Sequence, residues 1–142
     1  MINTLFVYGT LKQDEARGSL FGSWMNKTLF DVKAATVQAD LYDLGVFPAI
    51  VPGKGTVYGE AVTVKNPALM KHLVNTVDMI EGYSGDPEHP ENMYVRKKVP
   101  VCLATGEVVE AYAYFFARED LIKNFATLIE GGIWSEFKVS PQ

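Results

Sequence analysis

Cysteine and histidine are scarce in this chain. One cysteine, Cys102, and two histidines occur among 142 residues. A single cysteine excludes a disulfide within the chain and is typical of a reducing compartment. His72 and His89 do not have the spacing of a metal pair, and neither is near Cys102 in the sequence, so we expect no zinc site. Because Cys102 stands between Val101 and Leu103 in a strand pattern, we interpret it as a small core residue rather than a nucleophile.

Long apolar runs and concentrated positive charge are also absent. The longest apolar stretch, residues 111–117, is far shorter than the roughly 20 residues that span a bilayer. The N-terminal residues lack the basic and apolar segments of a signal peptide, so we predict a cytoplasmic protein with no membrane contact. The net charge is −4, and the largest basic cluster, residues 96–98, alternates between two strand faces, so we expect no nucleic-acid partner.

The motifs of several enzyme classes are missing as well. The chain has no P-loop, no G-x-G-x-x-G and no G-x-S-x-G, so we expect neither a nucleotide cofactor nor a serine nucleophile. What remains is an ordinary globular composition, with 48% hydrophobic and 21% charged residues and no repeat or linker. Residues 1–142 are therefore predicted to form one domain.

Strand patterns dominate the chain. Alternating or β-branched and aromatic segments predict strands over residues 3–8, 30–44, 56–64, 94–103 and 108–116. The last two are separated by four residues, 104–107, which is the length of a hairpin connection. Between the second and third strands, Pro and Gly signals predict a turn at residues 45–48 and irregular structure at residues 50–53.

Helical spacing is found in two places. The first helix is expected to begin at Asn66 as N-cap and Pro67 as first residue, and Gly82 is the natural residue to end it. The second is expected over residues 118–129, and residues 14–25 can hold a short additional helix. Five strands and two main helices without a βαβα rhythm indicate an α+β fold with a small mixed or antiparallel sheet.

A turn directly after the first strand is the first candidate for binding. Tyr8 is followed by Gly9, Thr10 and Leu11, and successive N–H groups in such a turn are left unpaired. Gly9 allows a ligand to approach the backbone closely, and the donors would suit a carboxylate or a developing oxyanion. The alternative is that Gly9 only begins a tight turn, and the pattern leaves both interpretations open.

Glu81, in the last turn of the first helix, is the candidate for acid–base chemistry. It lies at the edge of the apolar stripe, with Asp78 one turn earlier. Burial, the helix C-terminus and the like charge would each raise the pKa of this carboxylate, which suits a general base that later acts as an acid. The alternative is a solvated carboxylate in a fraying turn.

Arg96 and four tyrosines can each have either a binding or a structural role. Arg96 can pair with Glu81 or with a carboxylate of a ligand, or it can be an exposed strand residue, which is the default. Four tyrosines can line a pocket or form the polar edge of the core, and these are Tyr8, Tyr58, Tyr94 and Tyr112.

Six segments resemble motifs of one family, the gamma-glutamylcyclotransferase-like proteins, and they occur in the order of that family. The first is Tyr8-Gly9-Thr10-Leu11, similar to Y-G-[ST]-L, and residues 78–83 are similar to L-D-x-x-E-G. The others are residues 47–53 (P-A-[IL]), Val57-Tyr58-Gly59-Glu60, Tyr94-Val95-Arg96-Lys97 with Val99 and Val101 (Y-x-R-x-x-V-x-V), and Gly132-Ile133-Trp134 (G-x-W).

The resemblance implies a small barrel-like mixed fold and a cofactor-free reaction on a small gamma-glutamyl substrate. The α-amine of a gamma-glutamyl group would attack its own gamma-carbonyl, forming 5-oxoproline and releasing an amine. Glu81 would be the catalytic general acid/base, and residues 8–11, Arg96 and Tyr94 would bind the substrate.

Two features qualify this expectation. The loop reads Tyr-Gly-Thr-Leu without the extra residue found in members that act on gamma-glutamyl dipeptides, so the chain resembles the shorter branch that includes gamma-glutamylamine cyclotransferase. Residues 84–93 form a distinct segment that we expect to shape the leaving-group pocket. Two alternatives remain: a small-ligand binding module without turnover, and an enzyme that acts on a non-glutamyl amide.

Overall fold

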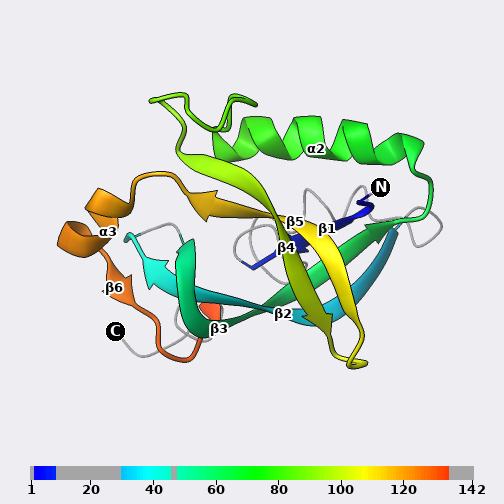
Figure 1. The fold of residues 1–142 in the computed structure, drawn as a ribbon, viewed down its shortest axis with the longest axis horizontal. Helices are drawn as coiled ribbons and strands as arrows, with labels where there is room; N and C mark the ends of the chain where they lie inside the picture. Colours follow the sequence, from blue (N-terminus) through cyan, green and yellow to red (C-terminus); the bar gives the residue numbers. More distant parts are fainter. Residues whose placement is uncertain (1, 9–29, 46–47, 135–142) are drawn as a thin grey trace.

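The strands of this protein form a sheet that closes on itself. The computed structural model describes residues 2–8, 30–45 and 48–134. The elements, in chain order, are β1 Thr4–Val7, β2 Phe30–Asp43, β3 Pro48–Val64, α2 Ala68–Glu81, β4 Tyr94–Leu103, β5 Val108–Phe116, α3 Glu119–Phe125 and β6 Thr127–Leu128 (Figure 1). The sheet has six strands in the order β3-β1-β5-β4-β2-β6, and a further pairing of β2 with β3 closes it into a ring.

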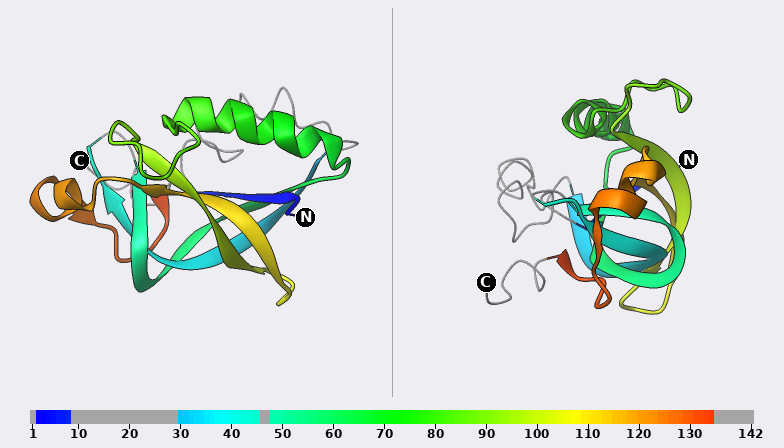
Figure 2. Two further views of the ribbon diagram at one scale, coloured as in Figure 1. Left: turned by 45° about the horizontal axis from the view of Figure 1, so that its top comes forward. Right: turned by 90° about the vertical axis from the view of Figure 1, so that its left-hand side faces the viewer.

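Most neighbouring strands in this ring are antiparallel. The exception is β1, which pairs in parallel with β5 through Leu5 and Tyr112. The other side of β1 pairs antiparallel with β3, from Thr4 opposite Thr63 to Val7 opposite Glu60. Viewed from the end, the strands curl around a common interior (Figure 2, right). The expected α+β fold with a small, mixed, barrel-like sheet and two helices is therefore confirmed.

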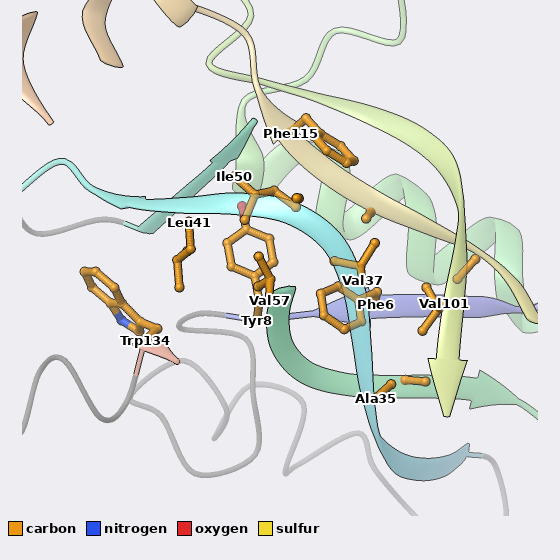
Figure 3. Packing of buried hydrophobic residues seen from close by; sticks show 14 of the residues in the cluster. Phe6, Tyr8, Ala35, Val37, Leu41, Ile50, Val57, Val101, Phe115 and Trp134 are labelled. Carbon is orange, nitrogen blue, oxygen red and sulfur yellow. The ribbon is translucent and has the colours of Figure 1, made fainter. Parts of the chain in front are cut away.

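The alternation of side chains along the strands builds two cores. In β5, Ala111, Ala113 and Phe115 belong to a cluster that fills the ring, together with Phe6 of β1 and the following residue, Tyr8. Figure 3 shows Phe6 and Tyr8 among the labelled side chains of this cluster. Small alanines from several strands leave room for these two rings, because a narrow barrel can hold few large side chains.

The second core lies between the outside of the ring and α2, which covers one side of the barrel (Figures 1 and 2). Its helix side consists of Met70, Leu73, Val74 and Val77, which contact the alternate residues of the strands. Full burial of one such side chain contributes about 1.5–3 kcal/mol, so this stripe holds α2 against the sheet.

The ends of α2 follow the signals in its sequence. The helix begins at Ala68, one residue later than predicted, and the side-chain oxygen of Asn66 accepts a hydrogen bond of 3.0 Å from the Ala68 N–H. Gly82 ends the helix with a φ of +68°, a conformation that costs other residues free energy. Glu81 is therefore the last helical residue, as the sequence predicts.

The predicted irregular structure at residues 50–53 is wrong. Ile50 and Val51 pair with Leu41 and Asp40, so β3 is continuous from Pro48. The Pro-Gly signal marks instead a change of register between Gln38 and Asp40, where β3 carries extra residues. The Asp40 carboxylate fills the bend and accepts a hydrogen bond of 3.0 Å from Gly55 N–H. A bulge thus replaces the expected loop.

The second predicted helix is too long. α3 ends at Phe125, and Thr127 and Leu128 form β6 beside Asp43 and Tyr42 of β2. The apolar spacing continues to residue 129, but these residues pair with the edge of β2 instead, where the Ile129 N–H donates a hydrogen bond of 2.8 Å to the carbonyl of Leu41. The possible helix at residues 14–25 lies outside the described residues. Among the helices that are described, none is long and apolar enough to cross a membrane.

Candidate functional site

Glu81 and Tyr8 are located at the same end of the barrel. β1 and α2 run in the same direction along the molecule, so the last residue of the helix lies toward the end at which the strand stops (Figures 1 and 2, left). Tyr8 follows β1 directly and is buried, whereas Glu81 is partly buried. The turn residues Gly9, Thr10 and Leu11, expected to bind the substrate, lie outside the described residues.

An ionic cluster fastens the end of α2 to the sheet. Arg96 on β4 donates two hydrogen bonds from Nη1 to Asp78, of 3.1 Å to Oδ1 and 2.9 Å to Oδ2. The hydroxyl of Tyr114 on β5 donates to the same Oδ1. The Asp78 side chain is 14% exposed and that of Arg96 is 22% exposed, so the pair is largely shielded from water. The default expectation that Arg96 is an exposed strand residue is therefore wrong.

Aromatic rings hold the Arg96 guanidinium in place. Its carbon lies 4.9 Å from the centre of the Tyr112 ring and 5.6 Å from the centre of the Tyr83 ring. Such cation–π contacts contribute about 0.5–2 kcal/mol each, more when the charge is desolvated. Arg96 is thus restrained by both its charge partner and its stacking partners.

The two tyrosines expected to contact substrate are engaged with backbone carbonyls. The Tyr8 hydroxyl donates a hydrogen bond of 2.9 Å to the carbonyl of Tyr114, and the Tyr94 hydroxyl donates one of 2.6 Å to the carbonyl of Pro48. These bonds join β1 to β5 and β4 to the start of β3 at the same end of the barrel. Tyr58, in contrast, is 47% exposed on the outside of the sheet.

The electrostatics of this region link Glu81 to both hydroxyls. Burial raises the pKa of Tyr8 well above its usual range, and the nearby Tyr94 and Glu81 groups raise it further. Burial also raises the pKa of Tyr114, aided by its hydrogen bond to Asp78 and by the charges of Asp78 and Glu81, while Arg96 lowers it. The Glu81 carboxylate therefore lies within electrostatic reach of Tyr8 and Tyr114.

Tyr114 and Tyr83 were not among the residues predicted to form the site. The observed hairpin pairs Cys102 with Val108 and so places Arg96 opposite Tyr114, whereas pairing across the predicted four-residue connection would have placed Phe115 there. Cross-strand neighbours share a face, so the one-residue shift in register is what brings the Tyr114 hydroxyl to the side of the sheet that carries Arg96. Tyr83 follows the helix-ending glycine, and its position beside Arg96 could not be derived from spacing.

Cys102 is exposed, so its interpretation as a core residue is wrong. Val101 and Leu103 point into the barrel, and strand alternation turns Cys102 outward. It lines a surface hollow of about 460 Å³ with Lys54 and Thr36. Neither Tyr8 nor Glu81 belongs to this hollow or to a second one of about 200 Å³ near Asp40. Within residues 2–8, 30–45 and 48–134, no group of three or more His, Cys, Asp or Glu residues could hold a metal ion.

Comparison with known proteins places the chain in a family. Residues 5–136 match the family described as gamma-glutamyl cyclotransferase, AIG2-like. The gamma-glutamylcyclotransferase family protein ytfP of Citrobacter rodentium is 29% identical over 132 residues, which cover 92% of this chain and 93% of that protein.

Solved structures agree in fold. The solution structure of ytfP from Escherichia coli is similar with a TM-score of 0.58 and 27% identity, covering 95% of this chain and 98% of that one. YkqA from Bacillus subtilis is similar with a TM-score of 0.62 and 25% identity over 97% of this chain, which spans only 41% of YkqA. With the family motifs in order and the closed barrel in place, this chain belongs to the gamma-glutamyl cyclotransferase, AIG2-like family.

Proposed function

We propose that this protein converts a gamma-glutamyl amide into 5-oxoproline and an amine, with Glu81 as general acid/base. The observation that carries the proposal is the position of the Glu81 carboxylate, at the barrel end where β1 stops and within electrostatic reach of Tyr8 and Tyr114. Tyr8 immediately precedes Gly9, Thr10 and Leu11, so a substrate held by their N–H groups would lie beside this carboxylate.

The reaction needs one group that accepts a proton and returns it. The substrate α-nitrogen attacks the gamma-carbonyl carbon, and Glu81 takes a proton from that nitrogen. The proton then goes to the leaving nitrogen as its bond to the carbonyl carbon breaks. Both reacting groups belong to one molecule, so orientation within a shaped pocket supplies much of the acceleration.

The other titratable side chains nearby fit this role less well. Asp78 already accepts hydrogen bonds from Arg96 and Tyr114. His72 and His89 are both exposed, on α2 and on the loop after it. Tyr94 and Arg96 would help to bind the substrate: Arg96 supplies positive charge, and Tyr94 fixes the backbone at Pro48.

A panel assay tests the proposal. The protein is incubated with gamma-glutamyl amines and gamma-glutamyl dipeptides, and 5-oxoproline and the released amine are measured together. Equal amounts of both products from at least one compound are expected. Amine release without 5-oxoproline would indicate simple amide hydrolysis. Calorimetric binding of 5-oxoproline with no turnover on any compound would instead indicate a binding module.

A further inference from the structure

We infer that Asp78 is a positioning residue, which acts through Arg96 and Tyr114 to set where the Glu81 carboxylate lies relative to Tyr8. The inference rests on the proposed function, since it assigns a role in that reaction to residues that need not touch the substrate. Three observations carry it: the place of Asp78 on the helix, the rigidity of its partners, and the double role of Tyr114.

Asp78 is the point at which the last turn of α2 is attached to the sheet. Asp78 and Glu81 are three residues apart and so lie on neighbouring positions of one helix face. The helix ends at Gly82, so no later helical turn restrains Glu81. Both carboxylate oxygens of Asp78 accept hydrogen bonds from the sheet, which fixes the rotation of this turn.

The groups that hold Asp78 are themselves held. The Arg96 guanidinium contacts the rings of both Tyr83 and Tyr112, which limits the freedom of its long side chain. Tyr83 comes directly after Gly82, and its N–H donates a hydrogen bond of 2.9 Å to the carbonyl of Asp78. The attachment therefore includes residues on both sides of Glu81.

Tyr114 contacts both halves of the proposed site. Its hydroxyl donates to Asp78, and its backbone carbonyl accepts the hydrogen bond from the Tyr8 hydroxyl. Tyr114 on β5 is therefore hydrogen-bonded both to the last turn of α2 and to the residue that follows β1. A shift of Asp78 would move Glu81 but leave Tyr8 in place.

A role in stability alone accounts poorly for this arrangement. A shielded ion pair contributes little net stability, because the cost of removing both charges from water offsets their attraction. A misplacement of about 1 Å at a reacting group, in contrast, can lower a rate by about 10²-fold. We therefore assign the cluster a role in positioning the Glu81 carboxylate.

The test separates kcat from KM. Asp78→Asn and Tyr114→Phe should each lower kcat about 10–100-fold and change KM much less than kcat, because neither of the replaced side chains is itself a proposed substrate contact. The double variant should lose no more than the worse single variant, since the residues act as one unit. Arg96→Lys should recover part of the kcat lost in Arg96→Met, whereas a pure substrate-binding role of Arg96 would raise KM instead.

A matched control comes from the exposed ion pair of Arg118 with Asp120, at 3.2 Å near the start of α3. Asp120→Asn removes the same charge and should leave kcat unchanged. An Asp78→Asn protein that melts earlier but keeps the wild-type kcat would overturn the inference. Tyr114→Phe, which only deletes a hydroxyl, serves the same purpose if Asp78→Asn does not fold.

A measurement without turnover keeps the inference separate from the proposed function. The ¹³Cζ chemical shift of Tyr8 should change on Glu81→Gln, because the Glu81 charge acts on that hydroxyl. The change should become smaller in the Asp78→Asn background, because the last turn of α2 then loses its attachment to Arg96 and Tyr114. An equal change in both backgrounds would contradict positioning by Asp78. A wild-type protein inactive on the whole panel would instead contradict the proposed reaction.

Discussion

The Tyr8 hydroxyl donates a hydrogen bond of 2.9 Å to the backbone carbonyl of Tyr114, although the two residues are 106 positions apart in the chain. This bond crosses between β1 and β5, which pair in parallel, at the point where β1 ends. It fixes the residue that precedes the proposed binding turn. This bond therefore helps to set the depth of Tyr8 in the barrel.

Replacement of Glu81 by Gln tests the proposed base directly. The change keeps the shape of the side chain but removes the group that accepts and returns the proton. General acid–base catalysis is typically worth about 10²–10⁴-fold, so 5-oxoproline release should fall by that order. The circular dichroism spectrum should be unchanged. Glu110→Gln, on the exposed part of β5, is the matched control and should keep full activity. Wild-type turnover by the Glu81→Gln protein would exclude Glu81 as the base.

The raised pKa values of Tyr8 and Tyr114 predict the alkaline behaviour of the folded protein. Because the pKa of each hydroxyl is raised in the folded state, the folded protein favours the neutral hydroxyl. The contribution of each tyrosine to the free energy of unfolding is therefore complete below the unfolded-state pKa of about 10. That contribution is lost as the pH rises above this value. The tyrosinate absorbance gained by about pH 10.5 should therefore be the same in wild type, Tyr8→Phe and Tyr114→Phe.

The complete tyrosine signal, from seven residues, should appear only on unfolding in denaturant. A smaller alkaline signal in either Phe variant would show that the missing hydroxyl ionises in the folded state.

The charges around Glu81 predict a shift of the acidic limb of kcat/KM. Asp78→Asn removes a negative charge one turn from Glu81 and leaves the Arg96 charge without its partner. Both changes favour the ionised carboxylate, so the limb should move to lower pH. Asp78→Asn combined with Arg96→Met removes both charges, and its limb should return toward that of the wild type. If the limb stays in place in the single variant, Asp78 and Arg96 do not act electrostatically on the base.

Gly59 in β3 should not tolerate a side chain. A Cβ at this position would lie 2.2 Å from the carbonyl oxygen of Val7 and 2.8 Å from Cζ of Phe6. Gly59→Ala must therefore displace β1 next to Tyr8, and overpacking of this kind costs about 1–3 kcal/mol or more. Chemical denaturation should show the loss. Gly85→Ala is the comparison, because its Cβ would meet nothing within 4 Å, and only the φ of +97° should cost stability there. Equal losses in both variants would contradict the close contact.

Local patterns in the sequence were sufficient for the elements whose interactions are short in range. The hairpin of β4 and β5 and the end of α2 at Gly82 were predicted because turn length, strand alternation and a helix-ending glycine act on adjacent residues. The same rules placed Glu81 in the last turn of α2. Family motifs then indicated the barrel and the role of this carboxylate, and the role remains a prediction.

Only the tertiary structure decided how distant segments meet. Pairing of β2 with β3 closed the ring and turned the Pro-Gly signal near residue 52 into a bulge. Thr127 and Leu128 pair with β2 as a short strand, although their spacing in the sequence predicted a helix. Arg96 forms an ion pair with Asp78, whereas the sequence had suggested Glu81 as its partner. Each outcome depends on backbone groups and charges that sheet closure brings together. The periodic pattern of one segment does not identify the distant segment with which its hydrogen-bonding groups and charges will pair.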